Sequence, residues 1–242
     1  MTARARDGSD EREYGLDDVS VVMGAYDEEE AVGSVLDAID DATDGAAEVV
    51  VVDGSSDATP EIARERGARV VEQEPQGYGV AVERALSEAT NPVVVTTDCD
   101  DTYPMDRIPD FLERINAGRD VVSGDRISGG ADAMPFVNRF GNRLFALLAS
   151  VLMLRRVHDT TTGMRAYHED VIDGIEWTEN TGLSAELLLR PTMRGYDVVE
   201  ESIAYGERLG DTTLDPIQGG WAIGLSILRV CLQERLGRAP GT

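Results

Sequence analysis

The first half of the chain alternates short runs of β-branched and aliphatic residues with longer segments whose apolar positions repeat at helical spacing. The short runs predict strands, and the longer segments predict helices. The predicted strands are Val19–Ala25, Glu48–Asp53, Arg69–Glu72, Val93–Thr97 and Asp120–Ser123. The predicted helices open at the N-caps Asp27 and Thr59 or span Gly77–Ala89 and Pro104–Asn116. This alternation predicts one α/β domain with a mostly parallel sheet flanked by helices.

The second half follows a different pattern. Gly124–Ala133 is rich in glycine and predicts a loop, whereas Leu183–Arg194 predicts a helix. Phe136–Leu154 predicts a helix with one apolar face, and Trp221–Leu232 predicts a second apolar helix. Neither supplies the roughly 20 consecutive apolar residues that span a bilayer. Each is therefore either packed in a core or exposed to a membrane or lipid.

The polarity of the two ends sets the predicted boundaries. Residues 1–18 are polar without periodicity and predict a disordered arm. Residues 19–214 form the α/β domain, and residues 215–242 form a C-terminal apolar or amphipathic helix and tail.

Acidic residues gather just after three predicted strands, in residues 26–28, 53–57 and 98–100. Ligands of open α/β sheets bind at the carboxyl ends of the strands, so these clusters are expected to share one edge. Asp98 and Asp100 are two residues apart, and paired carboxylates suit Mg²⁺ with a phosphorylated substrate. The alternative is a polar loop after each strand, in which acids such as Asp53 and Asp57 act as caps.

Composition narrows the functions further. The 242 residues carry a net charge of −24, and all 22 basic residues are arginine. This balance indicates adaptation to a very salty cytoplasm, and without a basic stripe it excludes nucleic-acid binding. Cys99 and Cys231 are far apart and support no disulfide framework, which favours a reducing cytoplasm. Cys99 lies between two aspartates, so its thiol pKa is expected to be raised.

Six segments together resemble one known family. They are Val21–Glu29, Val51–Thr59, Asp98–Asp100, Asn138–Asn142, Thr162–Arg165 and Glu200–Gly210. Their order is similar to that of the family 2 glycosyltransferases with the GT-A (Rossmann-like) fold, and most similar to the dolichyl-phosphate mannose and glucose synthases. The resemblance covers roughly residues 19–210 and departs from the pattern at Gly24, Asp27 and Val52, and again at Thr102 and Tyr103.

The resemblance implies a metal-dependent transfer of a hexose from a UDP- or GDP-linked sugar to a polyprenyl (dolichyl) phosphate. The residues that it places around the nucleotide sugar are Ala25, Tyr26, Glu28, Asp53, Ser55 and Asp98. It assigns Mg²⁺ or Mn²⁺ to Asp98 and Asp100. Because Thr102 and Tyr103 replace the usual Gln-His after the aspartate motif, Asp101 is the alternative third ligand. A cytoplasmic enzyme of this kind is expected to sit peripherally at the inner face of the cell membrane.

A phosphate acceptor, as the resemblance implies, requires positively charged side chains in the site and no general base. A phosphate monoester has a second pKa of about 6, so it attacks as a dianion without a general base. Arginines are then needed to hold it, because the guanidinium fork matches phosphate oxygens. The residues that the resemblance assigns to the acceptor phosphate are Arg139, Arg165 and Arg208, and those assigned to catalysis are Asp98, Asp100, Arg126 and Arg139. In-line attack would invert the configuration at the anomeric carbon.

Three other functions stay open at this point. Transfer to a glycan or soluble hydroxyl would need a carboxylate base, and Glu186 is the best candidate. A sugar nucleotidyltransferase would carry a lysine and a glycine-rich loop after the first strand, and this chain has neither. A non-catalytic sugar-nucleotide-binding protein would not need both Asp98 and Asp100.

Overall fold

The computed structural model describes residues 12–130, 133–210 and 216–237, with the side chains of residues 216–218 not described. The strands are β1 (Val19–Ala25), β2 (Glu48–Asp53), β3 (Arg69–Glu72), β4 (Val93–Thr96), β5 (Val121–Asp125), β6 (Arg165–His168) and β7 (Val198–Ser202). The α-helices are α1 (Val32–Thr43), α2 (Thr59–Glu65), α3 (Tyr78–Glu88), α4 (Ile108–Asn116), α5 (Arg126–Gly129), α6 (Phe136–Met153), α7 (Glu169–Asp173), α8 (Leu183–Arg194) and α9 (Pro216–Leu236). Short 3₁₀ turns cover Leu16–Asp18 and Met105–Arg107.

All seven strands form one sheet in the order β3-β2-β1-β4-β6-β5-β7. Every neighbouring pair is parallel except those of β6, which runs antiparallel to both β4 and β5. The predicted, mostly parallel α/β sheet is confirmed. The strand β6 was not predicted, because its sequence Arg-Ala-Tyr-His carries no apolar run.

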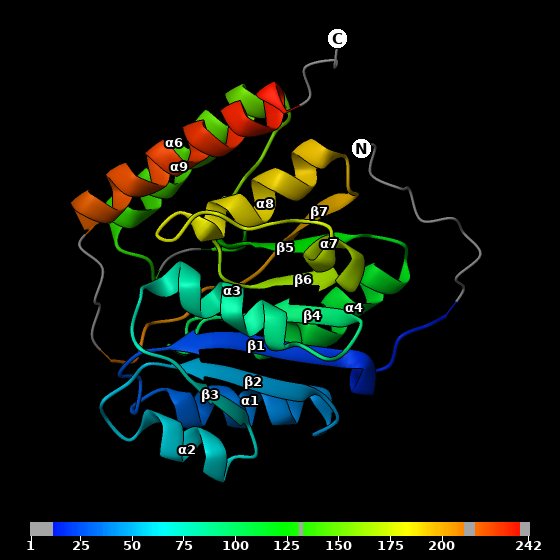
Figure 1. Cartoon of the computed structure of the whole chain (residues 1–242), viewed down its shortest axis with the longest axis vertical. Helices are drawn as coiled ribbons and strands as arrows, with labels where there is room; N and C mark the ends of the chain where they lie inside the picture. The colour runs from blue at the N-terminus through cyan, green and yellow to red at the C-terminus, as the bar shows by residue number, and fades with distance from the viewer. Residues whose placement is uncertain (1–11, 131–132, 211–215, 238–242) are drawn as a thin grey trace.

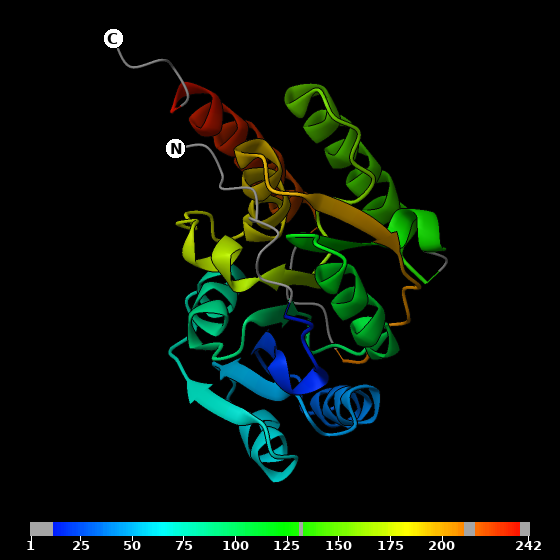
Figure 2. The same ribbon diagram turned by 90° about the vertical axis from the view of Figure 1, so that its right-hand side faces the viewer.

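Helices cover both faces of the sheet (Figure 1). Figure 2 shows α1 and α4 on one face, and α3, α7 and α8 on the other. The valines of β1, β2 and β4 alternate between two clusters of buried side chains, one under each helical layer. This two-sided burial is the reason that these strands read as continuous apolar runs.

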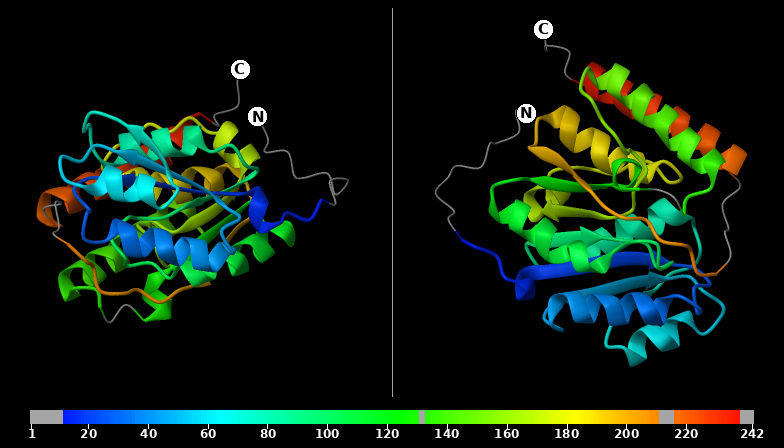
Figure 3. Two further views of the ribbon diagram at one scale, coloured as in Figure 1. Left: turned by 90° about the horizontal axis from the view of Figure 1, so that it is seen from below. Right: turned by 180° about the vertical axis from the view of Figure 1, so that it is seen from behind.

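Two long helices, α6 and α9, lie side by side at the end of the molecule farthest from β3 (Figures 1 and 3). They pack on α8 through a small cluster of Ala149, Ala185, Leu189, Ile227 and Val230 with Cys231. Many of their other apolar side chains are exposed, among them Leu147, Val151, Trp221 and Leu232. Within the described ranges, no helix combines the length and apolar character needed to cross a membrane.

A network of buried ion pairs holds α9 against α8. Arg190 bonds both Glu186 on its own helix and Glu234 on α9, and Arg194 adds a second cation to Glu234. Glu186 is fully buried and also accepts hydrogen bonds from the backbone N–H groups of Thr178 and Glu179. Its oxygens are therefore committed to structure, which removes the best candidate base for a hydroxyl acceptor.

Several local expectations are wrong. Asp27 does not cap a helix, because it takes a left-handed φ of 53° and its carboxylate accepts a hydrogen bond from Ser56. The helix α1 begins only at Val32, and α2 begins with Thr59 inside it. The expected loop at 124–133 instead contains the end of β5 and the helix α5, capped by the Asp125 side chain.

The end of the predicted arm is also ordered. Tyr14 packs against the sheet, with its hydroxyl 3.0 Å from His168 Nε2 and its backbone N–H donating to Asn116. The arm boundary predicted at residue 18 is therefore too late, and residues 1–11 lie outside the described residues.

Candidate active site

A cavity of about 1220 Å³ opens at the carboxyl ends of β1, β2 and β4. Its lower wall contains the backbone or side chains of Ala25, Tyr26, Glu28, Asp53, Asp98, Asp100, Arg126 and Arg208. These segments meet because parallel strands all end at one edge of the sheet. The structure therefore brings together most of the site residues that the sequence predicts.

Asp53 forms the floor at the β2 end of this cavity. Its carboxylate is buried and accepts hydrogen bonds from the Ser55 hydroxyl, at 2.7 Å, and the Ser55 N–H, at 3.2 Å. Burial raises the pKa of Asp53, and these hydrogen bonds oppose the rise. Asp57 instead accepts from both the N–H and the hydroxyl of Thr59, which matches the structural alternative considered for it.

The centre of the site is an acidic cluster of Glu28, Asp98 and Asp100. Burial is the largest cause that raises the pKa of Glu28 to about 7, and the Asp100 and Asp98 charges raise it further. Burial and the neighbouring Asp100 likewise raise the pKa of Asp98 to about 6. Three carboxylates that repel one another in a partly dry site favour a cation between them.

Arg208 contributes a positive charge to this cluster. Its Nη1 lies 2.7 Å from Asp100 Oδ2, and its Nη2 donates to Glu28 Oε1. The other oxygen of Glu28 is buried with no hydrogen-bond partner within the described residues. The acidic cluster is thus only partly compensated by this arginine.

A divalent cation fits this donor set. Asp98 and Asp100 offer carboxylate oxygens, and the unpartnered oxygen of Glu28 marks uncompensated negative charge beside them. Within the described residues, no three His, Cys, Asp or Glu side chains are arranged to hold a metal alone. The remaining ligands would therefore come from a bound substrate, as is usual for Mg²⁺ with phosphates. Asp101 is absent from the cavity lining and adopts a left-handed φ of 63°.

Arg126 is a fixed cation in the cavity wall. Its guanidinium donates to both oxygens of the buried Asp159, at 2.7 and 2.9 Å, and also to Thr161. The ring of Tyr205 lies 5.2 Å from its central carbon, which adds a cation–π contact. Asp159 therefore both orients Arg126 and cancels part of its charge.

The other two predicted arginines do not line the cavity. Arg165 is fully buried in β6, where it donates to the Ser123 hydroxyl and the Thr160 carbonyl. Arg139 is partly buried on α6, between the cavity-lining residues Asn138 and Phe140. Arg139 is thus beside the cavity, and Arg165 is buried within the sheet.

The upper end of the cavity is apolar. It is lined by α6 and α9 through Val137, Phe140, Leu144, Phe145, Leu148, Trp221, Ile223, Leu225 and Leu228. One continuous space therefore joins an acidic end at the sheet to an apolar end between two helices.

Two site residues, Tyr78 and Asn180, escaped the sequence analysis. The Tyr78 hydroxyl donates to Asp98 at 3.1 Å. Asn180 accepts from the Gly79 N–H at 2.9 Å and donates to the Gln76 carbonyl at 2.8 Å, so it fastens the segment that carries Tyr78. The available signal was the pair of glycines around this tyrosine, since Gly77 has a φ of 104° and a side chain on either glycine would collide with Asn180.

Burial raises the pKa of the Cys99 thiol, and the surrounding carboxylates add to this effect. The thiol is 3% exposed, so it lies in the core and not at the surface of the site. The expectation of an unreactive cysteine agrees with this environment.

Comparison with solved structures defines the class of protein. The glucosyl-3-phosphoglycerate synthase of Mycobacterium tuberculosis, solved with Mn²⁺, UDP-glucose and phosphoglyceric acid, superposes with a TM-score of 0.70 at 25% identity. The match covers 89% of this chain and 79% of that one. The fold is therefore that of the GT-A glycosyltransferases.

Sequence comparison gives the family. Residues 20–175 match the family described as Glycosyl transferase family 2, and the chain belongs to that family. A dolichyl-phosphate hexose transferase of Haloferax volcanii is 67% identical over 224 residues, which cover 93% of this chain and 98% of that protein. A dolichol-phosphate mannosyltransferase of Pyrococcus furiosus is 29% identical over 78% of this chain and 57% of that protein. The chain is thus a glycosyltransferase, as its motifs predicted.

Proposed function

We propose that this glycosyltransferase moves a hexose from a nucleoside diphosphate sugar to a polyprenyl phosphate, with inversion, at the cytoplasmic face of a membrane. The observation that carries the proposal is the single cavity with an acidic end and an apolar end. A nucleotide sugar with its metal suits the acidic end, and an isoprenoid chain suits the apolar end. The name of the Haloferax relative supports the acceptor, and the Mn²⁺ and UDP-glucose complex of the mycobacterial enzyme supports the donor.

The acidic end would hold Mg²⁺ or Mn²⁺ through Asp98 and Asp100. Such an ion supplies positive charge that stabilises a departing diphosphate. Ala25, Tyr26 and Asp53 would contact the nucleotide, because they line the cavity at the carboxyl ends of β1 and β2.

The acceptor phosphate would lie between this cluster and the helices. Arg126 and Arg208 face the cavity, and Arg139 stands beside it on α6. Arg208 can serve a phosphate only after leaving Asp100, so ligand binding is expected to exchange one partner for the other. A phosphate dianion needs no base, which is consistent with the structural commitment of Glu186.

The decisive experiment separates phosphate from hydroxyl acceptors. The protein is incubated in molar salt with a panel of UDP- and GDP-hexoses, a divalent cation, and either dolichyl phosphate or dolichol. Transfer of label to dolichyl phosphate alone is expected with at least one donor. Transfer to dolichol, with none to dolichyl phosphate, would overturn the proposed acceptor.

A further inference from the structure

A second hollow lies on another face of α6. This groove has a volume of about 580 Å³ and shares no lining residue with the active-site cavity. Its lining residues are Ile127, Ser128, Arg143, Ala146, Leu147, Ser150, Val151, Leu154, Arg155, Arg156, Val157 and His158. We call it the headgroup groove.

The charge of the headgroup groove is the reverse of the rest of the chain. Its lining contains three arginines and a histidine but no aspartate or glutamate. The whole chain has 46 acidic residues against 22 basic ones, so a surface without carboxylates is unusual here. Most of the described arginines outside the groove are paired with carboxylates, whereas these three are not.

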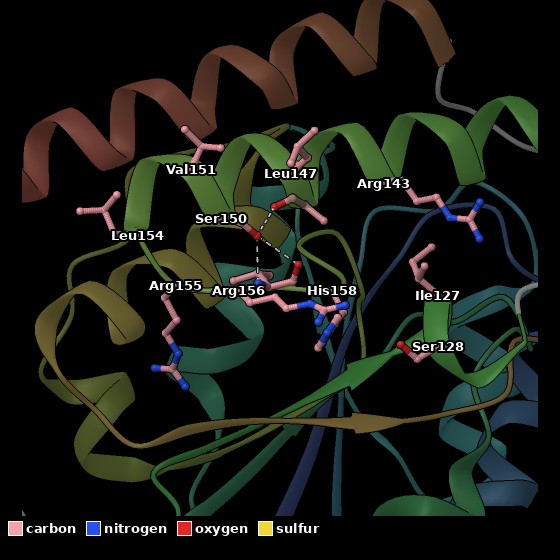
Figure 4. Close-up of a pocket in the computed structure, with 12 residues that line it drawn as sticks. Ile127, Ser128, Arg143, Leu147, Ser150, Val151, Leu154, Arg155, Arg156 and His158 are labelled. Carbon is pink, nitrogen blue, oxygen red and sulfur yellow. Dashed lines mark hydrogen bonds between the residues drawn. The ribbon is translucent and has the colours of Figure 1, made fainter.

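The three arginines of the groove have N–H donors that bond no described residue. Arg143 and Arg156 form no hydrogen bond or ion pair with any residue that the structure describes. Arg155 uses Nη2 to donate to the Val198 carbonyl at 2.6 Å, which leaves its other N–H groups available. Figure 4 shows Arg143 and Arg155 toward the two ends of the groove and Arg156 with His158 between them.

Hydrogen bonds hold the wall of the groove in place. The Ser150 hydroxyl accepts from the Val157 N–H at 2.9 Å and donates to the Ala146 carbonyl, which ties the segment after α6 back to the helix (Figure 4). The His158 ring is held from behind, with Nδ1 3.1 Å from Glu200 and 3.7 Å from Asp125. The cationic side chains therefore project from a fixed frame.

The rim of the groove is apolar and exposed. Leu147, Val151 and Leu154 are 61%, 62% and 87% exposed. The first two lie on the same face of α6 as Arg143, and Leu154 directly follows the helix. A soluble anion would gain nothing from these side chains. A nucleic acid would favour aromatic platforms, and the groove has none. The combination of cations and exposed aliphatic groups suits an amphiphile with an anionic head.

We propose that the headgroup groove binds the phosphate headgroup of an anionic membrane lipid and so docks α6 on the membrane. Molar salt reduces the Debye length to about 3 Å, so only cations that touch the phosphate contribute. Arginine forks suit such direct contact. Docking through this face would turn the adjacent face of α6, which lines the active-site cavity, toward the source of a lipid acceptor. The inference extends the membrane part of the proposed function and involves separate residues.

The test measures co-sedimentation of the full chain with vesicles of phosphatidylglycerol or of phosphatidylcholine, at fixed molar KCl. Binding to phosphatidylglycerol is expected to be stronger, and the variant Arg143→Gln/Arg155→Gln/Arg156→Gln is expected to bind at least about tenfold more weakly. The control Arg64→Gln/Arg84→Gln/Arg119→Gln changes the same charge at arginines outside the groove and should bind like the parent. A thermal unfolding curve for each variant verifies its fold.

Equal binding to the two vesicle types, or equal loss in the two triple variants, would overturn the inference. In a further arm, inorganic phosphate is titrated into the protein without vesicles. Phosphate binding that the groove variant loses, together with no vesicle binding by the parent, would also overturn the inference. Because no sugar donor or dolichyl phosphate is present, failure here is independent of the proposed reaction. Conversely, vesicle binding without any sugar transfer would contradict only the proposed reaction.

Discussion

The two ends of the active-site cavity are built in opposite ways. At the acidic end, Asp53 and Asp100 are 3% and 4% exposed and held by hydrogen bonds from their own loops. At the apolar end, Trp221 is 74% exposed and Leu225 is 55% exposed. The first end is preorganised for a ligand of defined charge and shape. The second end offers exposed apolar surface that does not fix the orientation of a ligand, which suits a long chain of repeated units.

The two ends also differ in what holds them. The acidic end is fixed by the sheet, whose parallel strands deliver the loops to one edge. The apolar end depends on α9, which is fastened by ion pairs of Glu234 with Arg190 and Arg194 and of Glu179 with Arg229. Polar contacts on one side of α9 thus leave its apolar side chains available to the cavity.

The largest effect is expected at the acidic end. Asp100→Asn removes one of the two carboxylates proposed for the metal, so transfer should fall about 100- to 1000-fold. The melting temperature should change little, because the substitution also relieves repulsion with Asp98 and Glu28. Asp101→Asn is the matched control and should retain transfer within about threefold. Steady-state kinetics with a labelled donor would measure both, and loss in the control would make Asp101 a ligand.

The apolar end should respond differently. Trp221→Ser/Leu225→Ser removes apolar area from the cavity wall and should raise the KM for a long polyprenyl phosphate about tenfold to a hundredfold. Nucleotide affinity, measured by calorimetry, should be unchanged, because the substitutions lie at the other end. Leu232→Ser/Leu236→Ser alters exposed leucines of α9 outside the cavity. If both double variants raised the KM for polyprenyl phosphate equally, the cavity lining would not determine acceptor binding.

Asn180 holds the segment that carries Tyr78. Asn180→Ala removes both hydrogen bonds to the segment around Tyr78, so the donor KM should rise about tenfold. Asn180→Asp keeps the acceptor for the Gly79 N–H but loses the donor to the Gln76 carbonyl, and an intermediate KM is expected. A lowered kcat with an unchanged donor KM would contradict this positioning role.

The smallest effect concerns pH and the docking of α9. The hydrogen bonds and charges of Arg194 and Arg190 lower the pKa of Glu234 against its burial. A carboxylate with a lowered folded-state pKa stabilises above its unfolded value of about 4.5, and this contribution disappears as the pH falls through the folded value. Glu234→Gln should therefore speed hydrogen exchange in α9 about fivefold at pH 7, and the difference from the parent should shrink steadily as the pH falls below about 4.5. A difference that stays constant as the pH falls would exclude ionisation of Glu234 as the cause.

Much of the acidic end was predictable from sequence. Valine runs that end in Asp53 and near Asp98 mark strands buried on both faces, and the parallel topology then brings their carboxyl ends together. Six ordered motifs also indicated the family correctly. The failures at Asp27 and at residues 124–133 have a common cause, because side chains from distant loops decide those local conformations.

The sequence by itself determined the alternation of strands and helices, the acidic edge and the excess of arginine over lysine, because these follow from local periodicity and composition. Only the tertiary structure decided what each charged side chain touches. It placed Arg165 inside the sheet, paired Arg126 with Asp159, bonded Glu186 to Arg190 and the Glu179 N–H, and left Arg143 and Arg156 in a groove without carboxylates. The physical reason is that a charge acts through its neighbours within a few ångströms, and those neighbours come from segments far apart in the chain.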